Sequence, residues 1–353
     1  MNDVSALVDR LSSLGRDVVD SIVRGEFPVL RIPERGTGNL SLAEPGEQIR
    51  LGESYTTRSS GNLRHVRSFA QIIWVAWYVK QLLKTGRTSS LRDLYYSSEA
   101  FGVKFKDQAE SDKAVTDLEA LIGVPREDMG VFPEEHSSIY GRVTLKYNVP
   151  GYEGREIDLT ISPDGLPVGP AMMSAQIVSS DARVILAVES GGMFSRLIET
   201  GAFDRFDAIL IHLGGQAPRS TRRFMRRLRM ELGLPVVIFT DGDPWGMHIA
   251  QVIISGSANA AHIPDLAVPD AKWIGVTASD IREYSLPTEA MNDLDLKRLD
   301  ELSADPRYMT SDWQHHLHEF RELRRKAEQQ SFSRYGMDFV VDEYLSTKLA
   351  EFT

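Results

Sequence analysis

Two aspartates separated by one glycine stand directly after a short apolar run. The run is Pro235–Phe239, and Asp241 and Asp243 lie in the segment Thr240–Gly246 that follows it. A short β-branched run bounded by turn residues predicts a buried strand, so both carboxylates emerge where a strand ends. Burying carboxylates without a partner is costly, and a cation such as Mg²⁺ would offset that cost. The alternative is an Asp-Gly turn in which Asp243 caps a helix.

A third acid, Glu189, ends another apolar run, residues 183–189. Functional residues of parallel sheets lie at the carboxyl ends of the strands. If the two strands are neighbours, Glu189, Asp241 and Asp243 converge on one metal site. We favour this interpretation over chance placement of three acids at two strand ends.

A second group of reactive side chains lies upstream, in the segment Leu91–Tyr96. A tyrosine hydroxyl has a pKa of about 10 and is a poor nucleophile until a base or metal favours the phenolate. Arg92 could favour the phenolate of Tyr96 and neutralise a phosphate. The alternative is a core helix in which Tyr95 and Tyr96 are simply packed.

An arginine-rich helix is predicted over residues 221–232, with apolar residues on its opposite face. Like charges four residues apart repel unless an anion lies over them. The arginine face comprises Arg222, Arg223, Arg226 and Arg227. It either contacts DNA or an acidic partner, or it is a solvated surface.

We interpret His315, His316 and His318 as surface histidines, because no carboxylate motif of a zinc protease accompanies them.

The first half of the chain supplies the elements around Tyr96. A helix is predicted over residues 4–24, followed by a Pro- and Gly-containing arm. Three further helices begin near residues 66, 89 and 108, and residues 143–149 alternate like a strand. Three helices with a β element suggest a winged helix-turn-helix; an unspecialised helical subdomain is the alternative.

The second half alternates between strand and helix patterns. Strands are predicted over residues 183–189, 206–213, 234–239 and 273–276, and helices over 193–199, 221–232 and 245–254. Such alternation predicts an α/β fold, a parallel sheet with helices on its faces.

Composition narrows the class of protein. The 353 residues suggest two domains, and 42% hydrophobic and 25% charged residues are ordinary for a globular protein. The absence of cysteine excludes disulfides, thiolate zinc sites and cysteine nucleophiles. No apolar run is long enough to span a membrane and no signal peptide is present, so we expect a cytoplasmic location. No Walker A motif is present, so we expect no ATP binding through a P-loop. The net charge of −10 argues weakly against nucleic acid, although the arginine-rich helix remains compatible with DNA.

Taken together, residues 91–96, 188–189 and 240–246 resemble the A subunit of topoisomerase VI, the type IIB DNA topoisomerase. That family is similar to the meiotic transesterase that makes double-strand breaks. The resemblance covers almost the whole chain. It implies an N-terminal helix and arm (residues 1–62), a winged-helix (CAP-like) domain (63–150), and a Toprim domain with a mostly parallel sheet and a C-terminal helical extension (151–353). Ser190 departs from the family, where relatives often place a lysine after the glutamate.

The resemblance also implies a mechanism. Tyr96 would attack a phosphodiester of double-stranded DNA and stay linked to the 5′ phosphate, while Arg92 helps to hold that phosphate. Glu189, Asp241 and Asp243 would hold Mg²⁺. In the family the tyrosine of one protomer works with the acids of the other, so a homodimer is required.

Further partners follow from the same resemblance. A GHKL ATPase B subunit would dock on the N-terminal helix and arm and would bind ATP. Two A and two B subunits would form an A2B2 heterotetramer. In it, B would drive strand passage, and the complex would relax and decatenate nucleoid DNA. Three alternatives remain: a stand-alone transesterase that needs no ATPase partner, a non-catalytic winged-helix DNA-binding protein, and a hydrolytic Toprim nuclease that does not use Tyr96.

Overall fold

The computed structural model describes residues 4–42, 47–134 and 137–352. The chain divides into two compact units. The first takes in the residues up to Ser41, Arg50–Glu134 and Ala258–Pro264; the second takes in Leu42–Ile49, Glu135–Ser257 and the residues from Asp265 onward. Residues 137–150 belong to the second unit, and the N-terminal helix belongs to the first.

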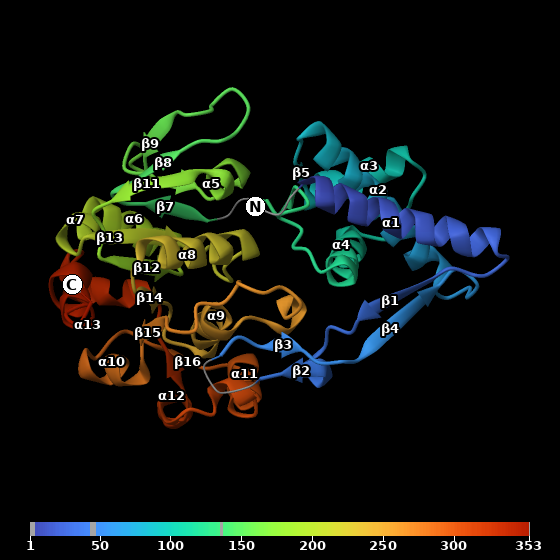
Figure 1. Cartoon of the computed structure of the whole chain (residues 1–353). Coiled ribbons are helices and arrows are strands. Elements are labelled where there is room, and N and C mark those ends of the chain that lie inside the picture. Colours follow the sequence, from blue (N-terminus) through green and yellow to red (C-terminus); the bar gives the residue numbers. More distant parts are fainter. Residues whose placement is uncertain (1–3, 43–46, 135–136, 353) are drawn as a thin grey trace. The chain divides into compact units, whose positions relative to one another are not determined.

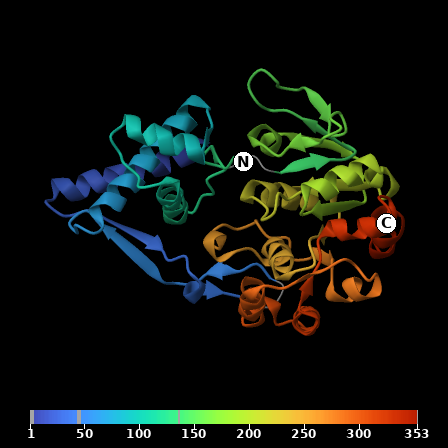
Figure 2. The ribbon, with the colours of Figure 1, turned by 180° about the vertical axis from the view of Figure 1, so that it is seen from behind.

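The first unit is mainly helical. Its helices are α1 (Val4–Val23), α2 (Val66–Thr85), α3 (Leu91–Ala100) and α4 (Gln108–Ile122), with short 3₁₀ helices Thr37–Asn39 and Ala258–Ala260. Its strands are β1 (Val29–Pro33), β2 (Leu40–Ser41), β3 (Arg50–Leu51), β4 (Tyr55–Ser59), β5 (Ser89–Ser90) and β6 (Val131–Phe132). The antiparallel pair β1 and β4 forms an extended ribbon that is visible in Figures 1 and 2.

Helix α2 organises the core of the first unit. Its apolar run buries Phe69, Ile72, Val75 and Val79, which pack with residues of α1, α3 and α4 in one cluster. Gly86 ends the helix in the left-handed conformation (φ 63°), which glycine adopts without steric cost.

The second unit is built on a six-stranded sheet. Its strands are β7 (Ser138–Tyr140), β10 (Leu166–Pro167), β12 (Val184–Val188), β13 (Ala208–His212), β14 (Val236–Phe239) and β15 (Lys272–Gly275). Their order is β10-β7-β13-β12-β14-β15, and β7 alone runs against its neighbours. The α/β class is therefore confirmed, and the sheet is mixed because β7 joins it antiparallel.

Alternate residues of the central strands face two apolar layers. Ile185 and Ile238 pack with α8 (Arg219–Leu232) and α9 (Pro244–Ser255) on one side. Leu186 and Phe239 pack on the other side with α6 (Gly191–Glu199), α7 (Ala202–Arg205) and the C-terminal elements. The continuous apolar runs of the sequence thus correspond to strands buried on both faces.

The C-terminal elements are mostly short (Figure 1). They comprise α10 (Ala278–Glu283), β16 (Glu289–Ala290), α11 (Asp293–Ser303), 3₁₀ helix Pro306–Tyr308, α12 (Ser311–Leu323), β17 (Arg325–Lys326), 3₁₀ helix Gln329–Tyr335, π-helix Val340–Leu345 and α13 (Ser346–Lys348).

A separate three-stranded sheet, β11-β8-β9, also belongs to the second unit. Its strands are β8 (Val143–Lys146), β9 (Glu156–Asp158) and β11 (Gln176–Ser180), and α5 (Pro170–Ser174) precedes β11. The alternation over residues 143–149 correctly predicted a strand, but this strand pairs in the second unit instead of flanking the helices of the first. A wing formed by this strand is therefore not observed.

Candidate functional site

The tyrosine of the first unit lies on the exposed side of α3. Ser90 caps this helix, its side chain accepting a hydrogen bond from the Asp93 N–H at 2.9 Å. Leu91, Leu94 and Ser98 are buried on one face. Tyr96 points the other way and is 55% exposed, so its hydroxyl can meet a macromolecular substrate. The alternative of a packed core tyrosine is wrong for Tyr96.

Arg92 shares this face because it lies one helical turn before Tyr96. Its guanidinium carbon is 5.9 Å from the centre of the Tyr96 ring. The same guanidinium is 3.6 Å from the Glu134 carboxylate, in an ion pair whose side chains are both more than half exposed. Such an exposed pair is weak, so Arg92 can exchange Glu134 for a phosphate oxygen at little cost.

The three acids of the second unit lie at adjoining strand ends. β12 and β14 are parallel neighbours that align Val188 with Phe239. Glu189 follows β12 and Asp241 follows β14, and the Asp241 N–H donates to Glu189 Oε2 at 2.9 Å. The expectation that these strands are neighbours is confirmed.

We call the sheet edge formed by Glu189, Asp241 and Asp243 the acidic edge. Burial and mutual repulsion make negative charge unfavourable on these three side chains. Burial, and then the charge of Asp241, raises the pKa of Glu189 to about 8. Burial raises the pKa of Asp241 to about 6. A hydrogen bond from the Gln329 N–H opposes this rise, and repulsion from Asp243 adds to it. Burial also raises the pKa of Asp243. A bound cation would relieve all three effects.

Asp243 has a structural task as well. It caps α9, its Oδ1 accepting the Gly246 N–H at 2.7 Å, and Pro244 occupies the first helical position. A Cβ at Gly246 would collide with the Asp241 carbonyl oxygen, so glycine is required there. The capping alternative is therefore correct, and it does not exclude metal binding, because a carboxylate has two oxygens and the Gly246 N–H donates to Oδ1.

Three carboxylates are a suitable donor set for Mg²⁺, which takes oxygen ligands. In the part of the chain that the structure describes, however, no three acidic or histidine side chains form a ready coordination group. Glu189, Asp241 and Asp243 each direct one oxygen at a backbone N–H. Metal binding by these residues stays a prediction.

Two side chains near the acids were not found from the sequence. Lys326 forms an ion pair with Asp295 at 2.9 Å and lowers the pKa of Asp243 by its charge. Gln329 is wholly buried, and its backbone N–H donates to Asp241 Oδ1 at 2.8 Å. Neither residue belongs to a motif with a recognisable spacing; only their long-range contacts place them here.

The arginines of α8 are largely engaged within the second unit. Arg222 is buried, while Arg226 pairs with Asp265 at 2.8 Å and Arg227 with Glu231 at 2.5 Å. Arg223 is half-buried. These arginines therefore support the fold, and DNA contact by this helix stays a prediction.

The histidines of α12 divide into two kinds. His315 and His318 are exposed and pair with Glu319 and Glu322. His316 is half-buried and packs edge-on against Trp273, its ring centre 5.0 Å away. The surface interpretation is correct for the first two and wrong for His316.

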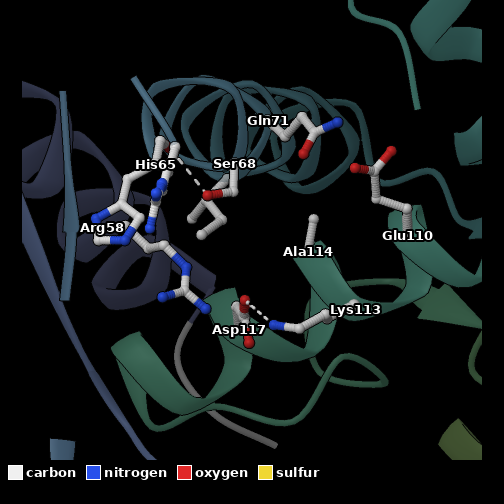
Figure 3. A pocket seen from close by; sticks show the side chains of 10 residues that line it. Arg58, His65, Ser68, Gln71, Glu110, Lys113, Ala114 and Asp117 are labelled. Carbon is white, nitrogen blue, oxygen red and sulfur yellow. Dashed lines mark hydrogen bonds and ion pairs between the residues drawn. The ribbon is translucent and has the colours of Figure 1, made fainter. Parts of the chain in front are cut away.

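A pocket of about 380 Å³ lies between β4, α2 and α4 of the first unit (Figure 3). Arg58, His65 and Lys113 line it together with Asp117. Lys113 and Arg35 both form ion pairs with Asp117. Glu110, which also lines the pocket, pairs with Arg67. We assign this pocket no ligand.

No helix within the described residues is long and apolar enough to cross a membrane. Tyr96 and Arg92 belong to the first unit, whereas Glu189, Asp241 and Asp243 belong to the second. The structure therefore brings the predicted residues together as two groups.

Comparison with known proteins defines the class. A family model for the Toprim domain shared by Spo11 and the A subunit of topoisomerase 6 matches residues 184–349. A type IIB DNA topoisomerase model matches residues 67–131. The α/β unit with its acidic edge is thus a Toprim domain, and the helical unit that carries Tyr96 is of type IIB topoisomerase class.

Full-length relatives give the family. The A subunit of type 2 DNA topoisomerase 6 from Methanothermobacter thermautotrophicus is 44% identical, over 99% of this chain and 98% of the relative. The proteins of the same name from Halobacterium salinarum and Archaeoglobus fulgidus are 37% and 35% identical, over 99% and 97% of this chain and 97% and 96% of the relatives. The chain belongs to the family of topoisomerase VI A subunits and is therefore part of a type IIB DNA topoisomerase.

Proposed function

We propose that this chain cuts and rejoins double-stranded DNA through Tyr96. The phenolic oxygen attacks a backbone phosphorus, a bond from tyrosine oxygen to phosphorus forms, and the bond to the 3′ oxygen breaks. The 3′ oxygen leaves as a hydroxyl and the 5′ phosphate stays on the protein. Reversal of these steps reseals the strand. The observation that carries this proposal is the exposed Arg92–Tyr96 pair on α3 in a chain of this family.

The charged residues have distinct tasks in this proposal. Arg92 holds a phosphate oxygen next to the nucleophile, since its guanidinium lies over the same face. Glu189, Asp241 and Asp243 would hold Mg²⁺, which would stabilise negative charge on the phosphate. The acidic edge has the buried, mutually repelling carboxylates that such a cation needs.

A homodimer completes the site in this proposal. Tyr96 and the acids lie in different units of the chain, and the family resemblance implies that the tyrosine of one protomer meets the acids of its partner. Each of the two sites then cuts one strand of a duplex.

A GHKL ATPase B subunit is the proposed second partner. Helix α1 and the residues after it expose apolar side chains that a docked protein would cover: Val19 at 57%, Ile22 at 60%, Val23 at 80% and Phe27 at 72%. We propose that B binds here, giving an A2B2 heterotetramer in which B binds ATP and drives strand passage on nucleoid DNA in the cytoplasm.

The experiment combines the chain with its B partner, Mg²⁺, ATP and supercoiled plasmid. Relaxation is expected for wild type and is expected to be lost in Tyr96→Phe and Glu189→Gln. Plasmid relaxation by Tyr96→Phe would overturn the assignment. Double-strand breaks that form without B or ATP would instead indicate a stand-alone transesterase. A chain that binds DNA without cleaving it, and that binds DNA equally well with Asp241→Ala and Asp243→Ala, would indicate a non-catalytic DNA-binding protein.

A further inference from the structure

One short segment near the C-terminus crosses the acidic edge of the large sheet. Its residues 326–330 run antiparallel to the loop after β14. The Gly242 N–H donates to the Ala327 carbonyl at 2.7 Å, and the Ala327 N–H donates back to the Gly242 carbonyl at 3.2 Å. The Gln330 side chain also donates to the Ser190 hydroxyl. The segment therefore contacts both loops that carry the acids.

Gln329 makes the central contacts of this segment. Its side-chain Oε1 accepts the Ser190 N–H at 3.0 Å, directly after Glu189. Its Nε2 donates to the Phe239 carbonyl at 3.0 Å, two residues before Asp241. Its backbone N–H donates to Asp241 Oδ1 at 2.8 Å. One residue thus links the end of β12 to the end of β14 and orients one of the acids.

The chemistry of these partners specifies glutamine. A backbone N–H can only donate and a backbone carbonyl can only accept, so the orientation of the Gln329 amide is fixed. Glutamate of the same shape would set a carboxylate oxygen against the Phe239 carbonyl and add a fourth acid to the edge. A methionine would fill the space but would take from the Ser190 N–H its bond to Gln329 and leave the Phe239 carbonyl with the Glu189 N–H at 3.1 Å.

We propose that Gln329 is a positioning residue for the metal site: its amide fixes the spacing of the two strand ends that carry Glu189 and Asp241. This role rests on the proposed Mg²⁺ site and adds to it a residue that touches neither metal nor DNA. Residues that orient metal ligands typically contribute about 10- to 100-fold to metal affinity.

The test measures metal binding directly. Mn²⁺, a paramagnetic substitute for Mg²⁺, is titrated into the full-length protein, and free Mn²⁺ is followed by electron paramagnetic resonance. Gln329→Met is expected to weaken Mn²⁺ binding about 10-fold or more. Gln329→Glu keeps the side-chain shape, serves as the second variant if Gln329→Met does not fold, and is expected to perturb the affinity as well.

Gln251 provides a matched control in the same unit. It is also wholly buried, and its Nε2 donates to the Ser255 hydroxyl at 2.7 Å and the Arg307 carbonyl at 2.9 Å, at the other end of α9 from Asp243. Gln251→Met is expected to lower the melting temperature yet keep wild-type Mn²⁺ affinity. A role of Gln329 in general stability alone would make the two variants behave alike.

The outcomes separate this inference from the proposed function. If Glu189→Gln abolishes Mn²⁺ binding but the Gln329 variants bind like wild type, the role of Gln329 is overturned and the metal site stands. If wild type does not bind Mn²⁺, or Glu189→Gln binds equally well, the metal site is overturned and the role of Gln329 with it.

Discussion

At the scale of single residues, Asp243 combines a structural and a chemical task. Its carboxylate caps α9, and in the proposed function the same carboxylate would bind a cation. Such double use explains why an Asp-Gly-Asp turn cannot be assigned from its sequence alone. The two tasks can nevertheless be separated, because the amide of asparagine caps a helix about as well as a carboxylate but is a poorer metal ligand.

We therefore expect Asp243→Asn to keep or raise the free energy of unfolding while abolishing Mg²⁺-dependent DNA cleavage. The asparagine keeps the cap. It also removes a carboxylate whose charged form is disfavoured by burial, which raises the pKa of Asp243. Asp243→Ala should in addition lose about 1 kcal/mol of stability with the cap. Chemical denaturation and a plasmid cleavage assay measure the two effects. Wild-type cleavage by Asp243→Asn would exclude this carboxylate as a ligand.

His248 on α9 predicts a pH dependence of stability. Burial, together with the charges of Arg298 and Arg307, lowers its pKa from 6.5 to about 4. The folded protein therefore favours the neutral ring. The stability due to this residue is complete above pH 6.5 and is lost as the pH falls toward 4.

A variant that cannot titrate, His248→Gln, should lose less stability than wild type between pH 6.5 and 4. Between pH 6.5 and 4, wild type should lose at most about 3 kcal/mol more free energy of unfolding than His248→Gln. Urea denaturation of both proteins at pH 7 and pH 5 measures it. Parallel losses in the two proteins would show that His248 ionises normally in the folded state.

At the scale of elements, the sequence predicted what local patterns can encode. The buried apolar runs identified β12, β13 and β14 and hence the edge where Glu189 and Asp241 meet. The pairing of β8 was not predictable, because alternation shows that one face is buried but not which unit covers it. Gln329 could not be predicted at all, since its partners lie 139 and 90 residues away and leave no spacing pattern.

Helix α8 is the element whose surface role can be tested by salt. Arg223→Gln with Arg227→Gln should flatten the dependence of DNA affinity on salt by about 0.9 in logarithmic slope for each phosphate contact removed. Arg183→Gln with Arg205→Gln is the matched control, because it removes the same charge from surface ion pairs in the same unit. Equal slopes for the two double variants would show that α8 does not contact phosphates.

At the scale of the whole molecule, nucleophile and acids lie in separate units. Mixed dimers test whether the two groups come from different protomers. A dimer of one Tyr96→Phe protomer and one Glu189→Gln protomer should nick one DNA strand if the site is shared, because the wild-type tyrosine then meets wild-type acids. If each protomer used its own acids, both sites would be inactive. Differently tagged protomers and a nicking assay on plasmid distinguish the two arrangements.

The central claim is that Tyr96 becomes covalently attached to DNA. The most direct measurement is to trap the cleaved complex with denaturant, digest the protein and identify the DNA-linked peptide by mass spectrometry. We expect the 5′ phosphate on Tyr96, an adduct that persists in Tyr95→Phe, and none in Tyr96→Phe. An adduct on any other residue, or cleaved DNA that carries a free 5′ phosphate and no protein, would contradict the account.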